Sequence, residues 1–165
     1  MKDIRKVCKE DIVGLKRVLE NVDLFPSEML DEMISDYLIN PESEEIWFTY
    51  TVENKPISIG YCAPQKLTER TYNLYAIGVH ADSQGQGIGK AMMDFIEKYL
   101  QDIGARILIV ETSSTLEFAL TRAFYNKIGY PRGYDQRFLE RWRRQSGFLE
   151  KTKHTIAKSA FIILA

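Results

Sequence analysis

The segment that most constrains the fold is Gln84-Gly85-Gln86-Gly87-Ile88-Gly89-Lys90, which lies between a predicted strand and a predicted helix. Residues 72–79 predict the strand, and apolar residues three or four positions apart from Ile88 to Ile103 predict a helix that packs along one face. Glycines let backbone N–H groups approach a diphosphate closely, and the helix N-terminus adds its positive dipole end. The segment therefore predicts a diphosphate-binding loop.

Two better-known phosphate loops do not fit this segment. A Walker loop needs Gly five positions before Gly89 and Ser or Thr after the lysine, where this chain has Gln84 and Ala91. A dinucleotide fingerprint that starts at Gly85 needs glycine where Lys90 stands. The sequence thus points to a different diphosphate ligand.

The remaining patterns predict an α/β fold with a mixed sheet and flanking helices. Strands are expected at 2–7, 46–52, 57–62, 72–79 and 106–110, and helices at 11–22, 27–40, 87–103 and 114–129. Ser114 and Glu117 predict a capping box for the last helix, and Leu120, Phe124 and Ile128 predict its buried stripe. The run Arg106–Val110 predicts a strand buried on both faces.

Composition excludes several classes of protein. No run of about 18 apolar residues and no secretion signal is visible, so we expect a cytoplasmic protein without a membrane partner. A net charge of −1 argues against a dedicated nucleic-acid binder. Cys8 and Cys62 lack metal-ligand spacing, so we expect no metal and interpret both as buried, reduced thiols.

Three segments in register resemble the GNAT superfamily of N-acetyltransferases. Residues 74–80 resemble that family's fourth strand, Gln84–Ala91 its Gln-x-x-Gly-x-Gly motif, and 123–130 (AFYNKIGY) its second motif. The resemblance implies an N-acetyltransferase that uses acetyl-CoA as cosubstrate and acetylates a primary amine of a small molecule or peptide. A homodimer is compatible with it.

The resemblance also implies roles for individual residues. The positions expected to bind the cofactor are Ile77, Val79, Gln84, Gly85, Gln86, Gly87, Ile88, Gly89 and Lys90. Tyr125 matches the tyrosine that protonates the departing thiolate, although it also fits a packed aromatic. Glu111, at a predicted strand end, is our candidate base, with a solvated strand end as the alternative. Phe118 stands where many members have a cofactor-binding asparagine, so that contact is not expected here.

The acceptor side carries a weaker signal. Two acidic and four aromatic residues lie in segments that would border it and favour a cationic or amine substrate: Glu28, Glu32, Phe25, Tyr37, Trp47 and Tyr61. Large aromatic residues are also common in protein cores. We therefore keep core packing as the alternative for most of the aromatics.

The chain changes character after residue 130, and we expect a GNAT domain at 1–130 and an atypical tail at 131–165. Residues 1–130 carry 14 Lys+Arg against 20 Asp+Glu, whereas 131–165 carry 8 against 3. The family continues here with two strands, but 137–151 reads as a basic helix, so we expect the edge of the strand at 106–110 to be uncovered.

A shifted reading frame is our hypothesis for this tail. Ordinary codons for residues 138–151, read in the adjacent frame, encode DFWSAGDDKVVFWK, which resembles the family's usual continuation. The rival interpretation is a genuine basic helix that contacts a membrane or RNA.

Two alternatives to an active acetyltransferase stay open. One is a catalytically impaired protein that still binds coenzyme A. The other is an unrelated nucleotide-binding α/β domain.

Overall fold

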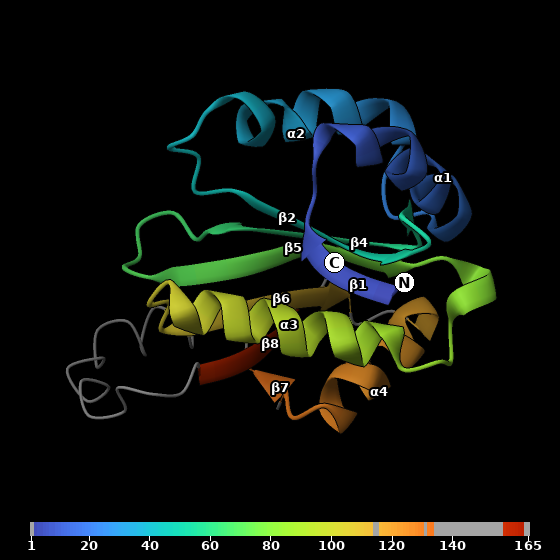
Figure 1. Ribbon diagram of the computed structural model, residues 1–165. Coiled ribbons are helices and arrows are strands. Elements are labelled where there is room, and N and C mark those ends of the chain that lie inside the picture. Colours follow the sequence, from blue (N-terminus) through green and yellow to red (C-terminus); the bar gives the residue numbers. More distant parts are fainter. Residues whose placement is uncertain (1, 114–115, 131, 134–156, 164–165) are drawn as a thin grey trace. The chain divides into compact units, whose positions relative to one another are not determined.

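The computed structural model describes residues 2–113, 116–130, 132–133 and 157–163 (Figure 1). The chain divides into two compact units, which are described separately. Unit 1 comprises 1–64 and 74–99, and unit 2 comprises 65–73 and 100–165. Among the described residues, no helix combines the length and the apolar character needed to cross a membrane.

Unit 1 holds the first half of the fold. Its strands are β1 (Lys2–Lys6), β2 (Ile46–Val52), β3 (Lys55–Pro56), β4 (Ser58–Pro64) and most of β5 (Thr71–Val79). Its helices are α1 (Ile12–Val22), α2 (Leu30–Ile39) and most of α3 (Ile88–Asp102), with short 3-10 turns η1 (Lys9–Asp11), η2 (Ser27–Met29) and η3 (Ala81–Ser83). These elements confirm the predicted order of strands and helices.

The sheet of unit 1 follows the order β1-β2-β4-β5, and β3 pairs with the end of β2. Strand β2 is antiparallel to both β1 and β4, and Trp47 lies opposite Tyr61. The turn after β2 places Glu53 and Asn54 at φ of 51° and 62°. Two successive residues with positive φ give the turn a twist that suits a tight β-hairpin.

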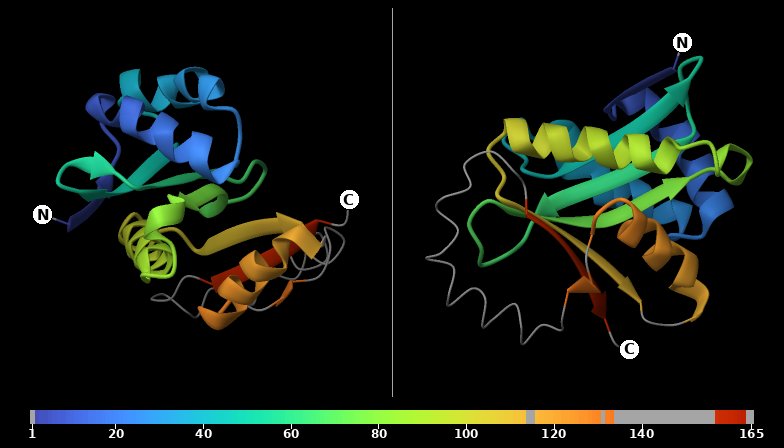
Figure 2. Two further views of the ribbon diagram at one scale, coloured as in Figure 1. Left: turned by 90° about the vertical axis from the view of Figure 1, so that its right-hand side faces the viewer. Right: turned by 90° about the horizontal axis from the view of Figure 1, so that it is seen from below.

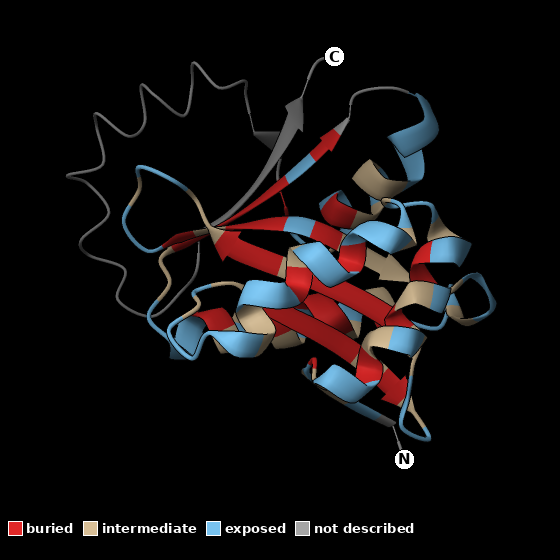
Figure 3. Ribbon diagram, turned by 90° about the horizontal axis from the view of Figure 1, so that it is seen from above, coloured by how far each residue is buried: buried red, intermediate tan, exposed pale blue. Residues whose placement is uncertain are grey.

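Alternation along β2 assigns its side chains to two separate cores. Trp47 packs with helices α1 and α2, whose cluster of buried residues contains Val7, Leu15, Val18, Leu19, Leu30, Ile34, Trp47 and Ile59. Phe48 faces α3 and meets the rings of Phe95 and Tyr99 at 5.7 and 5.3 Å. Figures 1 and 2 show α1 and α2 on one face of this sheet and α3 on the other. Both faces are therefore covered, and β2 and β4 are largely buried (Figure 3).

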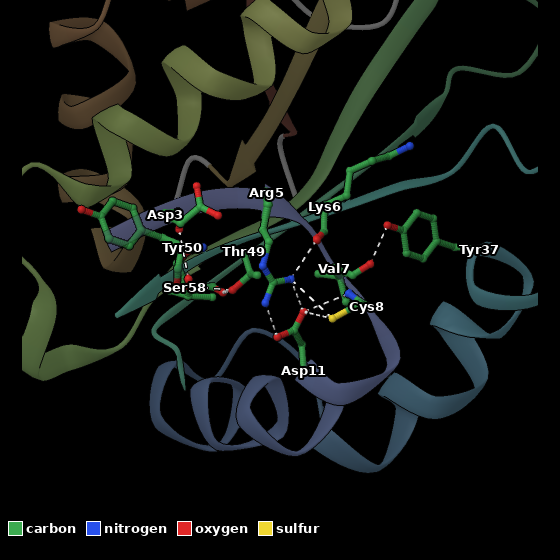
Figure 4. Close-up of polar contacts among 11 residues, drawn as sticks. Asp3, Arg5, Lys6, Val7, Cys8, Asp11, Tyr37, Thr49, Tyr50 and Ser58 are labelled. Carbon is green, nitrogen blue, oxygen red and sulfur yellow. Dashed lines mark hydrogen bonds and ion pairs between the residues drawn. The ribbon is translucent and has the colours of Figure 1, made fainter. Parts of the chain in front are cut away.

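A polar cluster fixes the passage from β1 into α1 (Figure 4). The Arg5 guanidinium donates to both carboxylate oxygens of Asp11, at 2.6 and 2.9 Å, and the Cys8 N–H donates to Oδ2 of Asp11 at 2.9 Å. Tyr37 donates to the Val7 carbonyl at 2.8 Å. Cys62 is buried as predicted, but the prediction for Cys8 is wrong, because its half-buried thiol takes part in this polar cluster.

The long helix α3 confirms the predicted apolar face except at its end. Met92, Ile96 and Leu100 are fully buried, whereas Ile103 is 47% exposed. The helix ends at Asp102, and Gly104 follows with a φ of +83°. Ile103 therefore lies beyond the last turn and is not part of the packed face.

Unit 2 contains the remaining elements. They are β6 (Ile107–Ser113), η4 (Leu116–Phe118), α4 (Ala119–Lys127), β7 (Arg132–Gly133) and β8 (Ala157–Ile163). Strand β8 is parallel to β6 along its whole length, from Ile107 opposite Ala157 to Ser113 opposite Ile163, and β7 pairs with the other edge of β8.

This pairing corrects the expectation that no strand follows residue 130 and that the edge of the strand at 106–110 is uncovered. The prediction considered only the basic segment 137–151, which lies outside the described residues. It overlooked residues 157–163, which end in Phe161, Ile162 and Ile163, residue types that are enriched in strands.

Helix α4 begins later than expected, and this changes which residues it buries. It starts at Ala119 after the turn η4, and Leu120 is 85% exposed, so the prediction that Leu120 belongs to the buried stripe is wrong. Tyr125, at 4% exposure, is the buried residue of this helix. Ser114, the predicted cap, lies outside the described residues.

Candidate active site

The glycine-rich loop lies between β5 and α3 in unit 1, as predicted. Gly85 and Gly87 have φ values of +73° and +80°, a region that other residues rarely adopt. A Cβ added at either position meets no atom within 4 Å. The backbone conformation, rather than crowding by the chain, is therefore what requires glycine at these two positions.

The loop and the helix start together present unpaired backbone donors. The Ala91 N–H donates to the Gly87 carbonyl at 3.0 Å, which is the first helical hydrogen bond. The N–H groups of Ile88, Gly89 and Lys90 precede this ladder and have no acceptor within the helix. The positive end of the helix dipole lies at the same place, so this exposed segment suits an anion such as a diphosphate.

Side chains of the loop hold its shape. Gln84 Nε2 donates to the Val79 carbonyl at 2.9 Å, and Gln86 Nε2 donates to the Asp82 carbonyl at 3.2 Å. Lys90 forms an ion pair with Asp94 one turn along the helix. These three side chains are thus engaged within the protein, which leaves their main-chain amides as the groups offered to a ligand.

Two hydrogen bonds anchor the chain between the end of β5 and the loop. Ile77 and Val79, the positions expected to bind the pantetheine arm, are half-buried at the C-terminal end of β5. The His80 N–H donates to the Ile57 carbonyl at 2.9 Å, and the Ala81 N–H donates to Asn21 Oδ1 at 2.6 Å. Sequence analysis missed Asn21, because a contact across 60 residues leaves no local pattern.

Glu111 lies on β6 in unit 2, with an exposed side chain. Asn73, which is only 2% exposed, donates from Nδ2 to Glu111 Oε1 at 3.2 Å and to Gln65 Oε1 at 3.3 Å. Both partners are acceptors, so the amide must present its nitrogen to them. Asn73 Oδ1 is buried and has no hydrogen-bond donor among the described residues. The result is a carboxylate held in place by a buried amide.

Sequence analysis did not single out Asn73, although the sequence offered a signal. Asparagine is depleted in strands, and here it stands inside a segment of strand-forming residues. A buried amide in a strand requires polar partners, which the structure supplies through Gln65 and Glu111.

Tyr125 lies in unit 2 between two other aromatic residues. Its ring meets Phe124 at 5.3 Å and Tyr130 at 5.8 Å, both edge to face. The Tyr130 N–H also donates to the Tyr125 carbonyl at 2.9 Å. Tyr125 is therefore packed within an aromatic cluster, and this environment is compatible with both of the roles expected for it.

The predicted acceptor-side residues fall into two groups. Glu28 and Glu32 are exposed on η2 and α2. Phe25 and Tyr37 pack against the α1/α2 core, and Trp47 is buried there with its ring stacked on Tyr61. Core packing thus accounts for Phe25, Tyr37 and Trp47.

Comparisons with known proteins agree with this architecture. A mixed sheet with flanking helices and a glycine-rich anion loop defines a class of α/β cofactor-binding domains. Residues 10–130 match the model of the Acetyltransferase (GNAT) family, and the chain belongs to that family. No curated protein matches the sequence significantly.

Solved structures extend the comparison. A protein of Desulfovibrio desulfuricans assigned to the GNAT family shares 26% identity, with 79% of this chain and 86% of that chain covered and a TM-score of 0.73. The ribosomal-protein-S18-alanine N-acetyltransferase of Escherichia coli shares 19% identity, with 81% of this chain and 79% of that chain covered and a TM-score of 0.65. A GNAT acetyltransferase of Brucella melitensis in complex with acetyl-CoA shares 18% identity, with 79% of this chain and 83% of that chain covered and a TM-score of 0.60. The last two show likeness of fold alone.

Proposed function

We propose that this protein transfers the acetyl group of acetyl-CoA to a primary amine of a small molecule or peptide. The observation that carries the proposal is the loop at 84–90, where two glycines with positive φ precede backbone amides that have no helical acceptor. Family membership and the acetyl-CoA bound to the Brucella melitensis structure support it.

In the proposed reaction, the amides of residues 86–90 bind the diphosphate, and the main chain near Ile77 and Val79 aligns the pantetheine arm. The neutral amine attacks the thioester carbonyl, and the tetrahedral intermediate expels the thiolate of coenzyme A. Glu111 takes the proton that the amine loses, directly or through water, and Tyr125 gives a proton to the thiolate. The products are the amide and free coenzyme A.

A pair of glycine substitutions tests the cofactor site. Gly87→Ala and Gly104→Ala both place a side chain at positive φ, at +80° and +83°, and both have open space for it. Each should therefore cost roughly 1 kcal/mol of stability. Only Gly87→Ala should weaken acetyl-CoA binding, by about tenfold or more, measured by isothermal titration calorimetry. Equal affinities of the two variants would contradict the assignment of the loop.

Activity is tested by release of free thiol from acetyl-CoA in the presence of a panel of amines. Dependence of the release on the amine identifies a transferase. Binding of coenzyme A without any release favours the second candidate, an impaired coenzyme A-binding protein. The unusual sequence from residue 131 onward is the observation that favours that candidate.

A further inference from the structure

A row of three aromatic rings crosses three neighbouring strands of unit 1. Trp47 of β2 stacks on Tyr61 of β4, with ring centroids 4.1 Å apart and planes inclined by 14°. Tyr61 in turn meets Tyr75 of β5 at 5.6 Å. The row begins with a fully buried Trp47 and ends with Tyr75, whose exposed fraction is 53%. Packing of the core explains Trp47 but does not explain the exposed Tyr75 ring that lies against Tyr61 at the other end.

A carboxylate lies beside the same rings. Glu45 immediately precedes the first residue of β2 and stands two positions before Trp47. Burial, followed by the charge and the hydrogen bond of Glu45, raises the pKa of Tyr61 above its ordinary value. The Glu45 carboxylate therefore lies close to the Tyr61 hydroxyl.

One oxygen of this carboxylate lacks a donor. Glu45 Oε2 is buried and has no hydrogen-bond partner among the described residues. A buried acceptor without a partner is destabilising, so a positive charge bound beside the carboxylate would offset part of that cost. Aromatic faces attract cations as well, and the attraction adds to that of a nearby carboxylate.

We propose that Glu45, Tyr61 and Tyr75 form a binding site for an organic ammonium group. The nitrogen that attacks acetyl-CoA must be neutral, whereas a carboxylate and aromatic rings favour a charged group. The site therefore holds a positive charge of the acceptor other than the amine that becomes acetylated. That this cation belongs to the acceptor rests on the proposed function, whereas the binding of a cation at this site does not.

Direct binding tests the site without any reaction. The probes are choline and the neutral alcohol in which carbon replaces its nitrogen, because the two have the same shape and differ in charge. Choline should bind the wild-type protein several-fold more tightly, as followed by NMR titration of the whole chain. Equal binding of the two probes would overturn the inference.

Substitutions then locate the binding. Glu45→Gln and Tyr75→Leu should each remove most of the preference for choline, whereas Tyr75→Phe, which keeps the ring, should retain it. Glu44→Gln is the matched control, since it removes the same charge from the neighbouring exposed residue. Should Glu45→Gln fail to fold, Tyr75→Leu decides the result, because its side chain is half exposed. An unchanged preference in Tyr75→Leu overturns the assignment.

Turnover connects the site to the reaction. Acceptors with a second positive charge should exceed matched monoamines by roughly tenfold in kcat/KM, mostly through KM, and Glu45→Gln should reduce that ratio. Affinity for acetyl-CoA should stay unchanged in Glu45→Gln. A wild-type protein that binds acetyl-CoA but shows no preference for acceptors with a second positive charge contradicts this inference, whereas absence of acetyl-CoA binding in the wild type contradicts the proposed function.

Discussion

At the residue scale, Tyr125 combines a packed position with a proposed chemical role. Tyr125→Phe keeps the ring contacts with Phe124 and Tyr130 and removes only the hydroxyl. We expect turnover to fall by roughly 10²-fold or more, the contribution typical of a general acid, while acetyl-CoA affinity changes little. Steady-state kinetics and calorimetry measure the two quantities. Unchanged turnover would remove Tyr125 from the mechanism and leave it as a packed aromatic.

The pair Glu111 and Asn73 makes a second prediction at this scale. Glu111→Gln removes the carboxylate that we propose as the base, so the pH–rate profile should flatten relative to the parent. Asn73→Ala should lower kcat by a smaller factor, because the carboxylate stays but loses its hydrogen bond at 3.2 Å. Gln65→Ala is the control, since it disturbs only the other contact of Asn73. A profile in Glu111→Gln identical to that of the parent would exclude Glu111 as the base.

At the scale of elements, the start of α1 depends on Asp11. Burial alone would raise the pKa of Asp11, but the hydrogen bonds from Arg5 and Cys8, together with the charge of Arg5, lower it below the ordinary value of 3.8. A carboxyl with a lowered pKa in the folded state stabilises the fold above its unfolded pKa. That contribution is lost as the pH falls through the lower, folded pKa.

Urea denaturation at neutral pH and below about pH 3.8 measures the contribution of Asp11 to the free energy of unfolding. Asp11→Asn should lower the free energy of unfolding by about 1–3 kcal/mol at neutral pH, and the difference from the wild type should shrink below about pH 3.8. Asp31→Asn, in the exposed pair with Lys16, should change it by less than about 1 kcal/mol. A deficit for Asp11→Asn that is the same at both pH values would contradict the linkage.

The sequence predicted elements well where a pattern is local. The strand, loop and helix from 72 to 103 follow from hydrophobic spacing and glycine positions, and the structure confirms them. Leu120 was assigned wrongly because a 3-10 turn delays the start of α4, a detail that spacing does not encode. Strand β8 was missed because its parallel partner β6 lies more than 40 residues earlier in the chain.

In the candidate site, too, local patterns were predicted and contacts between distant residues were not. The loop at 84–90 was recognised from a motif, but its links to Asn21 and its internal hydrogen bonds depend on contacts between distant residues. Asn73 and the unpartnered oxygen of Glu45 likewise become visible only when neighbouring strands are placed side by side.

At the scale of the whole molecule, we propose that residues 131–165 are a frameshifted continuation of a GNAT domain at 1–130. The coding DNA tests this directly, because a single-base change between about codons 130 and 137 should restore the alternative reading DFWSAGDDKVVFWK. The restored protein should bind acetyl-CoA at least as tightly as the present chain, measured by calorimetry. If no single-base change restores that frame, the hypothesis is wrong, and salt-sensitive binding to anionic vesicles or RNA would favour the basic-helix alternative.

The contact between β5 and the turn after α1 has a consequence for how substrate preference can change. A Cβ at Gly78 would lie 2.7 Å from Leu24, and Asn21 holds the amide of Ala81. The segment from 21 to 24 therefore contacts the end of β5, which leads into the loop at 84–90. Under the proposed function, substitutions in the segment 21–24 would therefore disturb cofactor binding as well as the acceptor side, whereas substitutions in α2, which begins at Leu30, leave these two contacts intact.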